Sequence, residues 1–155
     1  MQKTRAFTLV ELVIVLFITL LLISVAVPSL RGVLADRRLR ASLDEFNRLA
    51  QTAHERSLAE RRSYLVVWGD REITVRPESA ADNGEVIAAM RITGDEHWQL
   101  DFPAALQRDA PPEWIFWPSG NCEPVRISFS GKEGGWTAEY SPLAAAGNLV
   151  AYAPR

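Results

Sequence analysis

The sequence predicts an α+β protein in which a long N-terminal helix packs on an antiparallel β-sheet domain. Three observations lead to this fold class. A stretch of 24 residues from Phe7 to Leu30 carries a single charged group, Glu11. Apolar residues then recur at helical spacing as far as Ser57, and the chain from Tyr64 onward divides into short β-rich runs separated by turn residues.

The apolar stretch over residues 7–30 is long enough to cross a membrane. As a helix rising about 1.5 Å per residue it would be roughly 36 Å long, against a hydrocarbon layer of about 30 Å. A cleaved secretory signal is the alternative, but its apolar core needs only about 7–15 residues. The segment from Val25 to Pro28 is also a weak cleavage site for such a signal. We therefore expect a transmembrane helix over residues 7–30, after a short basic leader over residues 1–6.

Glu11 is the most informative residue of this stretch. A carboxylate at membrane depth is costly, by about 2.5–3.5 kcal/mol at a helix centre and less near an interface. Its presence therefore indicates a functional partner, and the apolar segment itself contains no such partner. The alternative is that Glu11 only reaches back to the headgroups on the cytoplasmic side.

The octapeptide RAFTLVEL, from Arg5 to Leu12, resembles the N-terminal signal of type IV pilins and type II secretion pseudopilins. It combines a basic leader, a small residue, Phe-Thr-Leu and a Glu four residues beyond the Phe. The resemblance implies that a prepilin peptidase cuts between Ala6 and Phe7 and that the new Phe7 amine is methylated. Pro28 fits as well, since these families commonly carry a Pro about twenty residues after the cleavage site. Ala6 departs from the usual Gly, which predicts slower cleavage.

The resemblance also assigns Glu11 a role in assembly. In these families the Glu is thought to face the methylated N-terminal amine of a neighbouring subunit, so that one buried charge pairs with another. A paired buried charge is tolerated, whereas an unpaired one is strongly unfavourable. The implied partners are the prepilin peptidase, other pseudopilins or pilins, an inner-membrane assembly platform and the lipid bilayer.

Beyond Pro28 the helix is expected to resume and run over residues 31–62 as an amphipathic continuation. One narrow apolar stripe with steps of three and four residues supports it: Leu39, Leu43, Phe46, Ala50, Ala53 and Ser57. The opposite face is charged, with Asp44 and Arg48 at a favourable i,i+4 spacing. A stripe this short is expected to lie on a sheet formed by the rest of the chain.

Residues 63–155 are expected to form a β-rich globular domain. A hairpin is indicated by the turn residues 69–71 between two β-rich runs, and a second by Gly131 and the pair Gly134-Gly135. In Val125–Phe129 the odd positions are apolar and are expected to face the core. The predicted strands cover residues 64–68, 73–76, 86–93, 98–102, 114–117, 125–129, 136–140 and 149–152.

The order of these features resembles the minor pseudopilins of the GspH/FimT kind, which have a β-rich globular domain. The motifs that carry this narrower resemblance are RRSY at 61–64, FWPSG at 116–120 and the run from Trp136 to Leu143. A major pseudopilin is disfavoured, because its C-terminal calcium loop needs several oxygen ligands. Residues 141–155 contain neither Asp nor Glu.

Charge counting alone would place the C-terminal domain in the cytoplasm. Lys3 and Arg5 precede the apolar segment, whereas four arginines follow it, offset only by Asp36: Arg31, Arg37, Arg38 and Arg40. The opposite orientation is expected, because the leader resembles a signal processed on the cytoplasmic face and because the arginines lie on a continuing helix. The predicted location is the bacterial inner membrane, with one pass and a periplasmic C-terminal domain.

Composition limits the remaining possibilities. The chain has 155 residues, and about 125 remain after the leader and the spanning helix, enough for one small domain. Its formal charge is −2, and loss of Lys3 and Arg5 with the leader leaves 15 basic against 19 acidic residues. This balance gives no support for nucleic-acid binding, whose footprint would be strongly basic. A single cysteine, Cys122, allows no intrachain disulfide.

No catalytic residue, metal site or cofactor is predicted. His54 and His97 are the only histidines, and no second His, Cys or carboxylate stands at metal-ligand spacing around His54; both are expected to be ordinary surface or edge residues. Ser119 lacks the leading glycine of a nucleophile elbow and is expected in a turn. Cys122 has no second cysteine beside it.

The tryptophans are expected to serve mainly as core or sheet-face residues. Trp98, Trp114, Trp117 and Trp136 all fall in predicted strands. Trp117 is the candidate for an interface, because strand parity prevents it from sharing a face with Trp114 and Phe116.

The sequence therefore predicts a structural subunit, a minor pseudopilin of a type II secretion pseudopilus. One alternative is a minor pilin of a type IV surface filament, which could include a role in DNA uptake. The other is a signal-anchored periplasmic binding domain that does not assemble.

Overall fold

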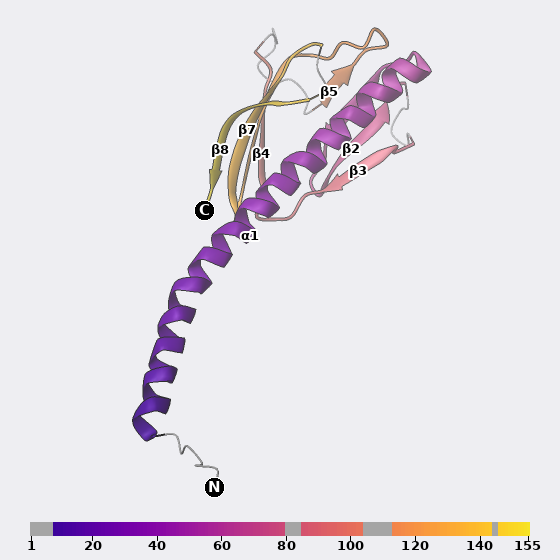
Figure 1. The fold of residues 1–155 in the computed structure, drawn as a ribbon. Coiled ribbons are helices and arrows are strands. Elements are labelled where there is room, and N and C mark those ends of the chain that lie inside the picture. The colour runs from indigo at the N-terminus through magenta and orange to yellow at the C-terminus, as the bar shows by residue number, and fades with distance from the viewer. Residues whose placement is uncertain (1–7, 80–84, 104–112, 144–145) are drawn as a thin grey trace.

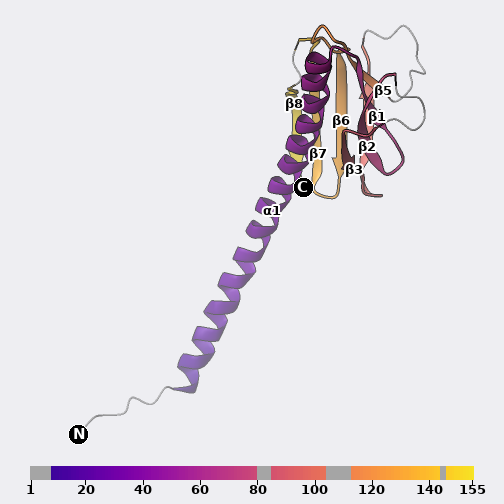
Figure 2. The same cartoon turned by 90° about the vertical axis from the view of Figure 1, so that its right-hand side faces the viewer.

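A computed structural model describes residues 8–79, 85–103, 113–143 and 146–155, apart from the side chains of residues 25–31. One long helix projects from a head of β-strands (Figure 1), and the second view shows the same projection from the side (Figure 2). The predicted α+β class, with an N-terminal helix packed on antiparallel strands, is confirmed.

The helix α1 extends from Leu9 to Glu60, 52 residues without interruption. Thr8 caps its start, since the Glu11 amide donates to the Thr8 Oγ1 at 3.2 Å. Arg61 ends it in the left-handed conformation, with φ of 51°. Pro28 lies inside the helix, which therefore does not stop and resume there. Only the C-terminal part of α1 contacts the head (Figure 1).

The strands form two antiparallel sheets, where the sequence suggested one. In the first sheet the order is β3-β2-β1-β5, and the strands are β1 (Tyr64–Trp68), β2 (Glu72–Pro77), β3 (Ala88–Arg91) and β5 (Glu113–Phe116). In the second the order is β4-β6-β7-β8, and the strands are β4 (His97–Asp101), β6 (Val125–Gly131), β7 (Gly134–Tyr140) and β8 (Asn148–Pro154). The division arises because β4 pairs with β6 while β5 returns to pair with β1. Such long-range pairing leaves no local signal in the sequence.

Each predicted strand corresponds to an observed one, and no strand end differs from its predicted position by more than two residues. The predicted hairpin at Gly69 is confirmed, since its amide donates to the Glu72 carbonyl at 2.9 Å. In the second hairpin the glycines lie in the strands, with Gly131 paired to Gly134, and only Lys132 and Glu133 form the turn. Gly134 has φ of 131°, and a side chain there would collide with the β8 backbone.

The predicted stripe on α1 is its buried face. Leu39, Phe46, Ala50, Ala53 and Ser57 are all buried, and only Leu43 is half-buried. The alternation in β6 is also confirmed, because Val125, Ile127 and Phe129 are buried while Arg126 is exposed.

Phe46 lies at the centre of the core, where the helix meets both sheets. Its ring is 5.8 Å from that of Trp68 and 6.4 Å from that of Trp114, both in the first sheet. From the second sheet the rings of Trp98, Trp136 and Tyr140 lie at 5.4, 6.1 and 5.9 Å. One helical side chain therefore joins two sheets that share no ladder.

Polar tethers fix the helix to the second sheet around this aromatic cluster. The Tyr140 hydroxyl donates to the Asn47 Oδ1 at 2.7 Å, and the Trp136 Nε1 donates to the Ser42 Oγ at 2.9 Å. Burial raises the pKa of Tyr140 well above its ordinary value, so this hydroxyl stays a donor.

The substitution Phe46→Ala should destabilise the head by roughly 3–5 kcal/mol, because it opens a cavity among five aromatic rings. Urea unfolding of the detergent-solubilised protein, followed by tryptophan fluorescence, measures this change. The matched control is Glu45→Ala at the exposed neighbouring position, which should change the free energy of unfolding by less than about 0.5 kcal/mol. Similar small effects at both positions would contradict this account of the core.

Candidate assembly surface

The N-terminal part of α1 presents an apolar surface that nothing in the described head covers. Every side chain from Leu9 to Ser24 is exposed, and large ones such as Leu16 and Phe17 are 63% and 62% exposed. We call residues 9–24 the apolar half of the helix. A helix that is apolar all round is normally buried in a protein core or in a membrane. This surface is therefore the strongest candidate for a binding site in the molecule.

Glu11 is the single charged residue of the apolar half. It lies in the first turn of α1, where a carboxylate is favoured by the partial positive charge of the helix N-terminus. The Thr8 carbonyl accepts a hydrogen bond from the Glu11 amide at 3.1 Å, so the backbone here is held by the cap. Among the residues that the structure describes, no ion pair includes the Glu11 carboxylate.

The other predicted processing and assembly residues are placed only in part. Ala6 and Phe7 lie outside the described residues, so their roles remain predictions. Pro28 is placed by its backbone within α1, and its role in assembly also remains a prediction.

A polar junction of Asp36, Arg40 and Tyr152 joins the head to α1 at the point where the helix leaves the head. The Tyr152 hydroxyl of β8 donates to Asp36 Oδ1 at 2.7 Å, and Arg40 Nε donates to Asp36 Oδ2 at 3.0 Å. These two donors lower the pKa of Asp36, which stays ionised at neutral pH. The Arg40 guanidinium also lies 5.3 Å from the centre of the Tyr152 ring. The junction therefore attaches residues 36–40 of the helix to β8.

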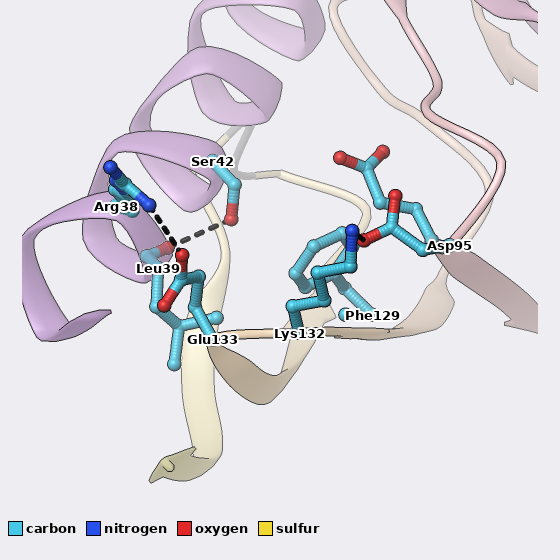
Figure 3. A pocket seen from close by; sticks show the side chains of 9 residues that line it. Arg38, Leu39, Ser42, Asp95, Phe129, Lys132 and Glu133 are labelled. Atoms are coloured by element: carbon cyan, nitrogen blue, oxygen red, sulfur yellow. Dashed lines mark hydrogen bonds and ion pairs between the residues drawn. The ribbon is translucent and has the colours of Figure 1, made fainter.

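A cavity of about 210 Å³ lies beside this junction, between α1 and the β6–β7 hairpin (Figure 3). Leu39 and Phe129 supply its apolar lining. Four of its charged residues form two ion pairs, since Arg38 pairs with Glu133 at 2.7 Å and Lys132 with Asp95 at 3.3 Å. The first of these pairs ties the hairpin to the helix.

Trp117 lies at the opposite end of the head, and the structure leaves it 38% exposed, unlike the buried Trp114 and Phe116. Its predicted place in a strand is wrong, because β5 ends at Phe116. The backbone turns there instead: the Trp117 carbonyl accepts from the Gly120 amide at 3.0 Å, and its amide donates to the Asn121 carbonyl at 2.8 Å. An interface at Trp117 remains a prediction.

The residues considered for catalysis lie on different elements. His54 lies half-buried on α1 with its ring 6.4 Å from that of Phe116, and His97 is exposed on β4. Ser119 is exposed in the turn after β5, as expected. No cluster of three or more potential metal ligands exists in the part of the chain that the structure describes.

Cys122 is buried, and its Sγ donates to the Ser141 carbonyl at 3.3 Å. Burial raises the pKa of its thiol to about 11, so the group stays protonated at neutral pH. A nucleophilic cysteine needs the opposite shift. The thiol is therefore a packing group.

Comparison with known proteins agrees with the N-terminal signal and the fold. Residues 1–27 match the family described as the prokaryotic N-terminal methylation motif. Two structures of the minor pseudopilin EpsH, from the type II secretion system of Vibrio cholerae, superpose with TM-scores of 0.53 and 0.55. They cover 73% and 76% of this chain and 96% of each of theirs, at 14% and 13% identity.

The chain therefore carries the N-terminal methylation motif at residues 1–27 and shares the fold of the minor pseudopilin EpsH. This confirms the resemblance carried by residues 5–12 and by the order of the later motifs. The type IV minor pilin FimU of Pseudomonas aeruginosa is also similar, with 15% identity over 74% of this chain and 87% of that one, at a TM-score of 0.47. A search among curated proteins gives no match.

Hydropathy adds one observation about the described helix. Within the described residues, no helix is both long enough and apolar enough to qualify as a membrane span.

The Cys122 thiol should react with Ellman's reagent at pH 8 at least about a hundredfold more slowly in the folded protein than in urea. With a pKa near 11 only about one thiol in a thousand is ionised at pH 8, compared with about one in ten for the ordinary value of 9. Equal rates in the folded and unfolded protein would show that the thiol is accessible and ionised.

Proposed function

We propose that this chain is a minor subunit of a type II secretion pseudopilus. The observation that carries the proposal is the apolar half of α1, uncovered by its own head, bearing one carboxylate and beginning within a matched N-terminal methylation motif. The fold shared with EpsH supports the secretion assignment. In this proposal the protein has a structural role and no reaction of its own.

Processing is the first step of the proposed mechanism. A prepilin peptidase cuts between Ala6 and Phe7, removing Lys3 and Arg5, and the new amine is methylated. The apolar stretch over residues 7–30 anchors the subunit in the inner membrane in a single pass, with the head in the periplasm. At about 1.5 Å per residue its 24 residues match the roughly 30 Å hydrocarbon layer.

Assembly then transfers the apolar half from lipid to the helices of neighbouring pseudopilins. The Phe7 amine of a neighbouring subunit supplies the positive charge that pairs with the Glu11 carboxylate. Among the described residues of its own chain, Glu11 forms no ion pair. Pairing of this kind sets the register between helices, because a shift of one turn would leave both charges unpaired in an apolar surround. The head stays outside the helical array, joined rigidly to it through Phe46 and the Asp36 junction.

The decisive substitutions are Glu11→Ala and Glu11→Gln, tested in a strain that lacks the native gene. Both should reduce the subunit's share of the sheared filament fraction by at least about a hundredfold, since breaking a buried charge pair costs roughly 3–5 kcal/mol. Immunoblotting measures that share, and export of secreted enzymes should fall with it. Intact mass should show the same shortened, methylated N-terminus as the unsubstituted protein.

The control for this experiment is Thr19→Val, which replaces the nearest polar side chain in the apolar half and should leave assembly unchanged. Thr19 bonds only its own helix, its Oγ1 donating to the Val15 carbonyl at 2.7 Å. Unchanged secretion with Glu11→Ala would contradict assembly and support an anchored periplasmic domain. Loss of surface pili or DNA uptake, with secretion intact, would instead support a minor pilin.

A further inference from the structure

Three exposed arginines lie together on α1 where it enters the head: Arg37, Arg38 and Arg40. We call them the arginine band. Ala35 and Leu39, on the same turns, are buried against the sheets, so the band occupies the remaining side of the helix. At about 100° per residue the three positions spread over an arc of roughly 160° within little more than one turn. The charges thus lie at one height on the side of the helix that faces away from the sheets.

The height of the band matches a bilayer dimension. From Glu11 to Arg37 and Arg40 there are 26 and 29 residues, or about 39 and 44 Å of helix. A bilayer measures about 40–45 Å including both headgroup layers. If Glu11 lies at the cytoplasmic interface, as the proposed anchoring requires, the arginine band lies in the headgroup layer of the opposite leaflet.

The side chains of the band are available for binding at this position. Arg37 forms no ion pair with any residue that the structure describes. Arg38 pairs with Glu133 and Arg40 with Asp36, yet their side chains are 69% and 67% exposed. Figure 3 shows Arg38 on the outer side of α1 reaching the hairpin. Exposed pairs of this kind are weak, so a competing anion can share the guanidinium groups.

We propose that the arginine band binds the phosphate groups of anionic phospholipids and holds the head against the membrane surface before assembly. Guanidinium groups match phosphate geometry with two parallel hydrogen bonds. The acidic surface of a neighbouring subunit is the rival occupant. Lipid fits better because the band lies at the height of the outer headgroup layer and faces away from the sheets. The proposal rests on the proposed anchoring.

The full-length protein, reconstituted in phosphatidylcholine vesicles with phosphatidylglycerol, provides the test. Electron paramagnetic resonance of spin-labelled phosphatidylglycerol and phosphatidylcholine measures which lipid the protein prefers. The unsubstituted protein should prefer phosphatidylglycerol by about fivefold or more, the effect of one surface arginine near anionic lipid. Because both leaflets have the same composition, the result does not depend on how the protein inserts.

The variant R37Q/R38Q/R40Q should lose this preference. The matched control R48Q/R56Q/R61Q removes three exposed arginines farther along the chain, at α1 and its cap, and should keep it. Arg37→Gln alone breaks no described ion pair, and it should lower the preference even if the triple variant fails to fold. A persistent preference in Arg37→Gln and the triple variant, or equal loss in the control, would overturn the proposal.

Flotation of the vesicles separates the two proposals. If the unsubstituted protein floats with the vesicles but shows no lipid preference, headgroup binding fails and anchoring stands. If the protein does not float, the proposed anchoring fails, and headgroup binding fails with it.

Discussion

The uncovered apolar half of α1 is the constraint on which the rest of the structure depends. Its side chains from Leu9 to Ser24 are exposed, and the described head lies too far along the helix to cover them (Figure 1). A surface of this kind is stable only in lipid or against other apolar helices. The two environments correspond to the two stages of the proposed function. In the proposed function Glu11 distinguishes them, because the hydrocarbon layer offers its carboxylate no cation, whereas the proposed processed N-terminus of a neighbour does.

The head is attached to the C-terminal part of this helix by packing and by hydrogen bonds. Phe46 joins the helix to both sheets, and Asn47, Ser42 and Asp36 add hydrogen bonds from β7 and β8. The arginine band lies between two of these attachment residues, Asp36 and Ser42, so the transition from apolar to charged surface coincides with the base of the head. Force applied to the helix during assembly would therefore reach the head through a short, well-packed segment.

Local patterns explain why so much of this fold could be predicted from the sequence. The stripe from Leu39 to Ser57 and the alternation of Val125–Phe129 each depend on neighbours in the chain. The strand pairing that divides the head into two sheets and the hydrogen bond between Asp36 and Tyr152 both join residues far apart in sequence. No local pattern predicts them. The apolar and aromatic run at 114–117 is typical of a strand and predicts Trp117 within it. The turn closed by the Gly120 amide ends the strand at Phe116 instead. For the candidate assembly surface, the motif predicts a role for Glu11 and a partner on another chain, and both remain predictions.

The central claim is that other helices cover the apolar half in the assembled state. The most direct measurement places a photo-crosslinking amino acid at Leu16, which is 63% exposed, in cells with and without the assembly ATPase. The account predicts crosslinks to pilin-type chains that appear only when the ATPase is present. Absence of protein crosslinks from Leu16 in both strains, with the subunit present in the membrane, would contradict it.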